Sequence, residues 1–182
     1  DDWIKGGFRA LAMGGPQAIR VEAIARKMKV SKGSFYWHFK DVGALKSAML
    51  DHWARLATYD AIAEIELEAD EGRTQLFALL KLATGSQNEQ YGGAAVEAAI
   101  RGWGRVDDAV APVVKKIEKA RLKFVSDLFE REGIDHIQSQ LNARLLYGAM
   151  IGLEQLPDVN RAKTRKDLEI LLKCFLSKKS DD

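Results

Sequence analysis

The sequence has a single cysteine, Cys174, and only three prolines in 182 residues. One thiol excludes an intramolecular disulfide and a zinc site built from clustered cysteines, which predicts a cytoplasmic protein. No apolar run approaches the roughly 18 residues of a membrane span, and no signal peptide is visible, so we expect no membrane partner. Few prolines and few β-branched runs, with frequent alanine and leucine, predict an all-α fold. The chain begins at Asp1 without Met, so we expect a few residues to precede it.

The residue patterns that support catalysis are also missing. Glu132 and His136 are four residues apart, but Gly133 breaks the helix between them, and no Glu-x-x-His pair is present for a di-iron bundle. The Gly102-Trp103-Gly104 run follows no predicted strand and is too short for a phosphate-binding loop. No serine or cysteine has a suitable base partner in the sequence. We therefore expect a protein that is not an enzyme, with no catalytic residues, no metal and no cofactor.

Charge is nearly balanced overall but unevenly distributed. The net charge is +2, yet residues 1–50 hold nine Lys/Arg against four Asp/Glu, and the remainder holds nineteen against twenty-two. A basic N-terminal part on a mildly acidic body is typical of nucleic-acid binding at one end. A chance asymmetry is the alternative.

The most informative stretch is residues 30–39, which reads VSKGSFYWHF. Ser31 is a good N-cap for a short helix from Lys32 to about residue 38. Phe35 and Phe39 are four residues apart and share one face of that helix. Tyr36 and Trp37 then point away from this face, with basic and hydroxyl side chains beside them, which suits a flat anionic surface. The alternative is that both are ordinary core aromatics.

A second short helix precedes this stretch. Residues 21–28 read VEAIARKM, and a three-residue link at 29–31 follows. Two short helices joined by so tight a turn form a helix-turn-helix, whose second helix can lie in the DNA major groove. Ala25 is small enough to let the two helices cross closely, and Asp41 can cap the longer helix that follows.

The sequence of these three helices and the links between them resembles the TetR/AcrR family of bacterial transcription regulators. The resemblance covers roughly the first 50 residues and is carried by Ile24-Ala25, by Val30 to Gly33, by Phe35 to Lys40 and by Ala44-Leu45. It implies a three-helix DNA-binding domain at residues 1–46, followed by a helical-bundle domain for ligand binding and dimerisation at 47–182. About nine helices are expected in all; the apolar spacing and breaks predict them near residues 3–13, 21–28, 32–38, 42–68, 74–85, 92–104, 107–132, 136–156 and 162–177.

The resemblance also assigns DNA contacts by position. At the start of the recognition helix, Lys32 would meet a base edge, Gly33 would allow close approach, and Ser34 would contact either a base or a phosphate. Tyr36, His38 and Lys40 are expected on phosphates, and Trp37 is expected against sugar or a thymine methyl.

Three positions depart from the family pattern. Many members have lysine where this chain has Val42, so we expect the phosphate grip there to come from backbone N–H groups or from Lys46. Lys29 stands where glycine is usual, which predicts a left-handed backbone conformation at small cost. Glu22 stands where relatives often have a basic residue or threonine, which weakens the case for a base contact from that helix.

The helical body is expected to enclose a small-molecule effector, since the resemblance implies a pocket enclosed by the fourth to the seventh helices. The absence of an evident buried charge favours an apolar or amphipathic ligand. Trp103 has glycines on both sides that leave room around it. For each pocket residue, simple core packing is the alternative. The predicted lining residues are Trp53, Tyr59, Phe77, Ile100, Trp103, Phe124, Leu128 and Tyr147.

The last two helices carry apolar faces that favour a four-helix homodimer interface, as in the family. Small residues four apart let two helices approach closely, and leucines follow in the final helix. Packing within one chain is the alternative. The predicted interface residues are Gly148, Gly152, Leu168, Leu171, Leu172 and Phe175.

These observations predict a ligand-responsive transcription regulator, most often a repressor in this family. It would bind a palindromic double-stranded DNA operator as a homodimer and be released by a small apolar or amphipathic molecule. The alternative is a TetR-like small-molecule binding or interaction protein without operator binding. Val42 and Glu22 favour that alternative, whereas the aromatic recognition helix and the basic N-terminal part oppose it.

Overall fold

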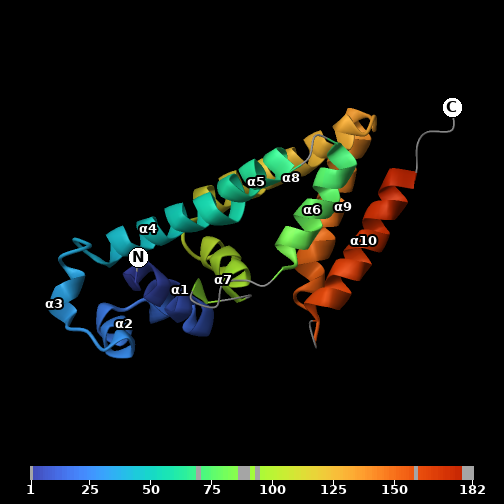
Figure 1. The fold of residues 1–182 in the computed structure, drawn as a ribbon. Coiled ribbons are helices and arrows are strands. Elements are labelled where there is room, and N and C mark those ends of the chain that lie inside the picture. Colours follow the sequence, from blue (N-terminus) through green and yellow to red (C-terminus); the bar gives the residue numbers. More distant parts are fainter. Residues whose placement is uncertain (1, 69–70, 86–90, 93–94, 158–159, 178–182) are drawn as a thin grey trace. The chain divides into compact units, whose positions relative to one another are not determined.

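The computed structural model describes residues 2–68, 71–85, 91–92, 95–157 and 160–177, and regular structure within these ranges is entirely helical (Figure 1). The predicted all-α fold is confirmed. If α4, η2 and α5 are counted as one helical run, the described ranges hold nine α-helical runs. The elements are α1 (Asp2–Gly14), η1 (Pro16–Ala18), α2 (Val21–Met28), α3 (Lys32–Phe35), α4 (Val42–Ala54), the π-helical η2 (Arg55–Tyr59), α5 (Asp60–Glu68), α6 (Gly72–Ala83), α7 (Ala95–Gly104), α8 (Ala111–Arg131), α9 (His136–Leu153) and α10 (Arg161–Ser177).

The chain divides into two compact units. Unit 1 comprises Asp1–Ala57 and Gln87–Ile117, and unit 2 comprises Thr58–Ser86 and Glu118–Asp182. The chain passes from one unit to the other three times, within η2, between residues 86 and 87, and within α8. The expected division of function at residue 46 stays a prediction.

Helix α1 is the centre of unit 1 and packs on α2, α4 and α7 (Figure 1). Two adjacent glycines allow this close packing. A Cβ atom added to Gly6 would lie 2.6 Å from Cγ2 of Ile24 in α2, and one on Gly7 would lie 2.4 Å from Sδ of Met49 in α4. Since real Cβ atoms do not approach so closely, a side chain at Gly6 would displace Ile24, and one at Gly7 would require the flexible Met49 side chain to move.

Unit 2 is a helical bundle in which α10 packs on α6 and α9, and α5 packs on α6. Its core is aliphatic and aromatic, with Ile65, Leu76, Leu128 and Phe129 almost fully buried. The turn before α9 was predicted correctly. Gly133 has a φ of 79°, and the Asp135 carboxylate caps α9 by accepting hydrogen bonds from the backbone N–H groups of residues 137 and 138.

Several predicted helix ends are wrong for local reasons. The predicted recognition helix, α3, ends at Phe35, where i→i−3 bonds follow: the N–H of Tyr36 bonds to the Gly33 carbonyl and the N–H of residue 38 bonds to the Phe35 carbonyl. Helix α8 begins at Ala111, because residues 107–110 form a turn that leads into it. Pro112 therefore lies in the first helical turn, where its missing N–H costs nothing.

The run predicted as one regular helix over 42–68 contains the π-helical turn η2. A π turn adds one residue to a helical turn and rotates the face that follows it. Within unit 2, it leaves Thr58 with an exposed fraction of 1%, and the Thr58 hydroxyl accepts a hydrogen bond of 2.8 Å from Nε of Arg121. None of the described helices combines the length and apolar character needed to cross a bilayer.

Candidate nucleic-acid interface

The turn between α2 and α3 has the geometry predicted from its sequence. Lys29 adopts φ 58° and ψ 38°, the left-handed conformation, and its N–H bonds to the carbonyls of Ala25 and Arg26. Ala25 itself is buried where α2 meets its neighbours. The prediction of a left-handed lysine at this position is confirmed.

The starts of α3 and α4 are both capped as predicted. The Ser31 hydroxyl accepts a hydrogen bond of 3.3 Å from the backbone N–H of Ser34. The Asp41 carboxylate accepts a bond of 2.7 Å from the backbone N–H of Ala44 at the start of α4. These caps satisfy N–H groups that the helices leave unpaired and so fix where α3 and α4 begin.

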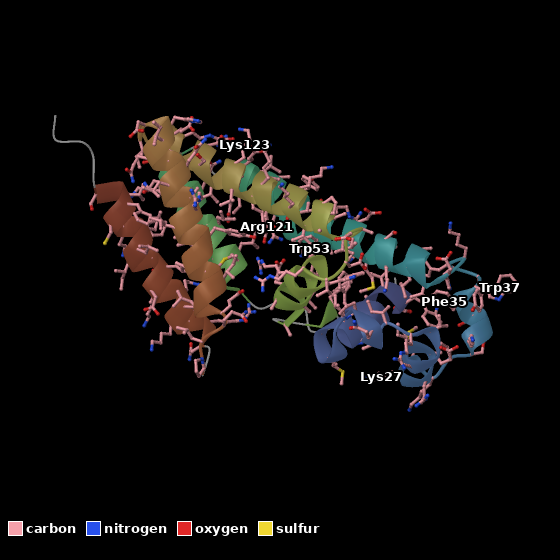
Figure 2. All side chains as sticks on the ribbon, turned by 180° about the vertical axis from the view of Figure 1, so that it is seen from behind. Lys27, Phe35, Trp37, Trp53, Arg121 and Lys123 are labelled. Carbon is pink, nitrogen blue, oxygen red and sulfur yellow. The ribbon has the colours of Figure 1, made fainter. Side chains whose placement is uncertain are left out.

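Phe35 anchors α3 to the core of unit 1. It is fully buried, its ring meets the Trp3 ring edge-on at 5.1 Å, and it stacks on the Phe39 ring at 5.7 Å. Two residues later, Trp37 has an exposed fraction of 89% and points away from the unit (Figure 2). The predicted division of these aromatics between an inner and an outer face is confirmed.

The outer face of α3 and the turn after it presents most of the residues expected to contact DNA. Lys32, Gly33, Tyr36, His38 and Lys40 are all exposed together with the outward tryptophan. The Ser34 side chain is half-buried, and its hydroxyl donates a 2.8 Å bond to the Ser31 carbonyl. Further exposed cations, which sequence reasoning did not assign, are Arg20, Arg26, Lys27 and Lys29.

Lys32 has an acidic partner that sequence reasoning missed. Its Nζ lies 2.5 Å from Oε1 of Glu22, in the first turn of α2. The hydrogen bond from Lys32 lowers the pKa of Glu22, and the same bond raises the pKa of Lys32, so both groups are charged near neutral pH. The signal available in the sequence was an acid in the first turn of α2 and a base in the first turn of α3, separated by a tight turn.

Lys46 lies elsewhere in unit 1. Its Nζ is 5.4 Å from the centre of the Trp103 ring, over the ring face. A role in phosphate binding for this lysine stays a prediction.

The expected pocket residues of unit 1 are buried in its core. Trp53 donates its indole N–H to Glu97 at 2.7 Å, Ile100 is fully buried, and Trp103 donates its indole N–H to Asp107 at 2.9 Å. The bond from Trp103 lowers the pKa of the Asp107 carboxyl. The flanking glycines leave room on one side only, because a Cβ on Gly104 would lie 2.9 Å from Val114, whereas one on Gly102 would contact nothing within 4 Å.

The expected pocket residues of unit 2 have varied surroundings. Phe124 and Leu128 are buried in the core, and Tyr59 is exposed. The Tyr147 hydroxyl accepts a hydrogen bond of 3.4 Å from Nη1 of Arg121, so a cation not foreseen from the sequence lies beside it. Phe77 lines an open cavity of about 430 Å³ between α5, α6 and α10. The other cavity residues are Glu68, Thr74, Ala78, Lys81, Arg165 and Glu169.

The expected interface residues fall into two groups. Gly148 and Gly152 are exposed on α9, and a Cβ on either would contact nothing within 4 Å. Leu168 and Leu172 are fully buried within unit 2 and hold α10 on the bundle. Leu171 and Phe175 are partly buried against the same core.

No described residues form a cluster of three or more His, Cys, Asp or Glu side chains able to hold a metal ion. His136 and Glu130 form an exposed pair, with 2.7 Å between Nδ1 and Oε1. The exposed aromatic and basic face at α3 is therefore the feature with the clearest chemical use.

Known proteins are similar to this chain in sequence at its N-terminal part and in fold. Residues 4–49 match the family model of bacterial regulatory proteins, tetR family. The fold is similar to that of a Rhodococcus sp. protein assigned to the TetR-family transcriptional regulators, with TM-score 0.78, 20% identity and 97% of each chain covered. It is also similar to a TetR-family transcriptional regulator from Streptomyces coelicolor, with TM-score 0.78, 16% identity and coverage of 97% of this chain and 87% of that one.

A protein of Saccharomonospora viridis assigned as a transcriptional regulator, solved in complex with choline, has TM-score 0.77 and 13% identity over 94% of each chain. Among curated proteins, no sequence matches this chain significantly. The family matched at the N-terminal part consists of regulatory proteins rather than enzymes, in agreement with the prediction from the sequence.

Proposed function

We propose that this chain, a TetR-family transcription regulator by its residues 4–49 and its fold, is a repressor that binds a palindromic operator as a homodimer and leaves it when a small amphipathic molecule binds. The observation that carries the proposal is the recognition helix. Buried Phe35 fixes α3 on unit 1, and the exposed face beside it combines cations, hydroxyls and the 89%-exposed Trp37. Cations and hydroxyls hold phosphates, and side chains at the start of such a helix reach base edges in the major groove.

The DNA part of the proposal is tested by a gel-shift titration of the chain on DNA upstream of its own gene, at several salt concentrations. We expect a complex that survives competition by a random duplex of equal length. Its affinity should fall as salt rises, since phosphate-bound cations are released from DNA on binding. Equal affinity for both duplexes at every salt concentration would contradict a sequence-specific regulator.

The homodimer is supported by an apolar stripe on α9. Ile137, Leu141 and Leu145 are exposed at helical spacing, with exposed fractions of 79%, 44% and 49%, and the stripe continues along the helix through Gly148 and Gly152. Small residues at the end of the stripe would let a second helix approach closely. Two copies of one recognition helix bind two half-sites, so dimerisation makes a palindromic operator the matching target.

The effector part rests on the cavity in unit 2. Phe77 and Ala78 supply apolar surface, while the carboxylates of Glu68 and Glu169 and the cations of Lys81 and Arg165 line the same space. Mixed lining of this kind suits an amphipathic molecule, and an aromatic ring with carboxylates suits one with a cationic group. The choline held by the Saccharomonospora viridis protein makes quaternary ammonium compounds the first to test.

The effector test uses choline and longer-chain quaternary ammonium compounds as probes. A bound probe should raise the melting temperature of the parent and lower its affinity for the operator, since a ligand stabilises the state that it binds. Phe77→Ala should reduce both responses. A probe that raises the melting temperature of parent and variant equally binds outside this cavity.

The alternative function is a TetR-like small-molecule binding protein without operator binding. The observation that favours it is the Glu22 carboxylate, which occupies Lys32 and adds a negative charge beside the recognition helix. The gel-shift titration separates the two functions, because the alternative requires effector binding without a specific DNA complex.

A further inference from the structure

The exposed ion pair between α2 and α3 joins two residues that are ten positions apart in the chain. Glu22 and Lys32 have side-chain exposed fractions of 59% and 52%, and only 2.5 Å separates Oε1 from Nζ. The left-handed turn at Lys29 brings the two helix starts together. The pair therefore belongs to the same surface as the outward side chains of α3.

Neither stability nor general DNA attraction explains this pair. Exposed ion pairs contribute little to folding, because water screens them and two long side chains lose freedom. A carboxylate facing DNA repels phosphates, and the pair cancels the charge that Lys32 would bring to non-specific binding. What the pair does provide is a hydrogen-bond donor and an acceptor side by side, 2.5 Å apart.

That spacing matches the major-groove edge of a G·C base pair. Guanine presents two neighbouring acceptors, N7 and O6, and cytosine presents the N4 amino donor next to O6. The O6 and N4 atoms are themselves hydrogen-bonded, so they lie about 3 Å apart. A lysine ammonium and a glutamate oxygen 2.5 Å apart present the complementary order of donor and acceptor.

We propose that Glu22 and Lys32 act together to read one G·C base pair in each operator half-site, with Lys32 donating to guanine O6 and N7 and Glu22 accepting from cytosine N4. This inference rests on the proposed DNA-binding function. An A·T pair fits less well, because adenine has an amino group where guanine has O6, so Lys32 keeps only N7 as an acceptor. The negative charge that favoured loss of DNA binding becomes a source of specificity.

The test exchanges the two charges. In the double variant Glu22→Lys, Lys32→Glu the donor stands on α2 and the acceptor on α3, while the net charge and the ion pair remain. Binding-site selection from randomised duplexes should show one preferred G·C pair per half-site for the parent, by roughly five- to 150-fold over other pairs. The exchanged variant should prefer C·G at the same position, with an unchanged salt slope.

A matched control exchanges Lys123 and Asp127 on α8, an exposed pair with 2.7 Å between Nζ and Oδ2 (Figure 2 labels Lys123). This control should keep the parent's base preference. The Glu22→Ala variant should show more similar affinities for duplexes with different base pairs at this position. If Glu22→Ala instead strengthens binding to every duplex with the preferred pair unchanged, or if the exchanged variant keeps the parent preference, the inference is wrong while the proposed function stands. If the parent forms no specific complex, the proposed function fails and this inference falls with it.

Discussion

Phe35 and Trp37 offer the sharpest comparison, because two large aromatic residues two positions apart have opposite surroundings. Phe35 has an exposed fraction of 0% and contacts the Trp3 and Phe39 rings, whereas Trp37 is 89% exposed. Truncation of a buried aromatic to alanine leaves a cavity and costs about 3–5 kcal/mol. Phe35→Ala should therefore destabilise unit 1 by about that amount, and Trp37→Ala should change stability by no more than about 0.5 kcal/mol.

A change of about 3–5 kcal/mol is large against the total stability of a domain, about 5–15 kcal/mol. For a chain of this size it corresponds to a fall in melting temperature of roughly 6–20 °C. Urea unfolding followed by circular dichroism measures the stability of both variants. Operator affinity, corrected for the folded fraction, measures the expected contact of Trp37 with DNA.

We expect Trp37→Ala to keep the parent's stability and to weaken operator binding, because it removes only outward contacts. The reasoning is refuted if Trp37→Ala unfolds as early as Phe35→Ala, since Trp37 would then belong to the core. It is equally refuted if Phe35→Ala has the same stability as the parent, since Phe35 would then not anchor α3.

Other predictions concern the remaining surfaces. Tyr36→Phe should weaken binding to all DNA sequences about equally and leave the salt dependence of the affinity unchanged, because tyrosine is neutral. Lys40→Ala should instead reduce the slope of log affinity against log salt by about one unit. Titrations of both variants at several salt concentrations test this difference. Gly148→Leu with Gly152→Leu should split or distort the homodimer, and an unchanged dimer in sedimentation would count against the α9 stripe. Trp103→Phe removes the N–H that lowers the pKa of Asp107 in the folded state. A lowered folded pKa stabilises the fold above the unfolded value, near pH 4, and that stability is lost as pH falls through the folded pKa. The variant should therefore lose less stability than the parent on acidification, which unfolding curves from pH 6 to pH 3 measure.

Local signals made much of the N-terminal part predictable. The Ser31 and Asp41 caps, the left-handed Lys29 and the inward Phe35 all depend on residues within about four positions of each other. Hydrogen bonds and side-chain spacing over one helical turn determine such features, so the sequence alone contains the necessary information.

Contacts over longer distances were not predictable in the same way. The Arg121–Thr58 hydrogen bond joins residues 63 positions apart, and it places a cation beside Tyr147 where the sequence indicated no buried charge. Helical periodicity gives the face of a residue but not its neighbour in another helix. For the same reason, the leucines of α10 were read as one apolar face, although Leu168 and Leu172 are fully used by the core of unit 2.

The recognition helix depends on packing that lies outside it. Helix α3 has only four residues, and a helix so short has no stability of its own in water. The direction of its outer side chains is therefore set by Phe35 against Trp3 of α1, and α1 in turn packs on α4. In the proposed regulator, sequence specificity at the outer face would therefore depend on residues that do not touch DNA, because a displaced anchor would move every donor and acceptor on that face together.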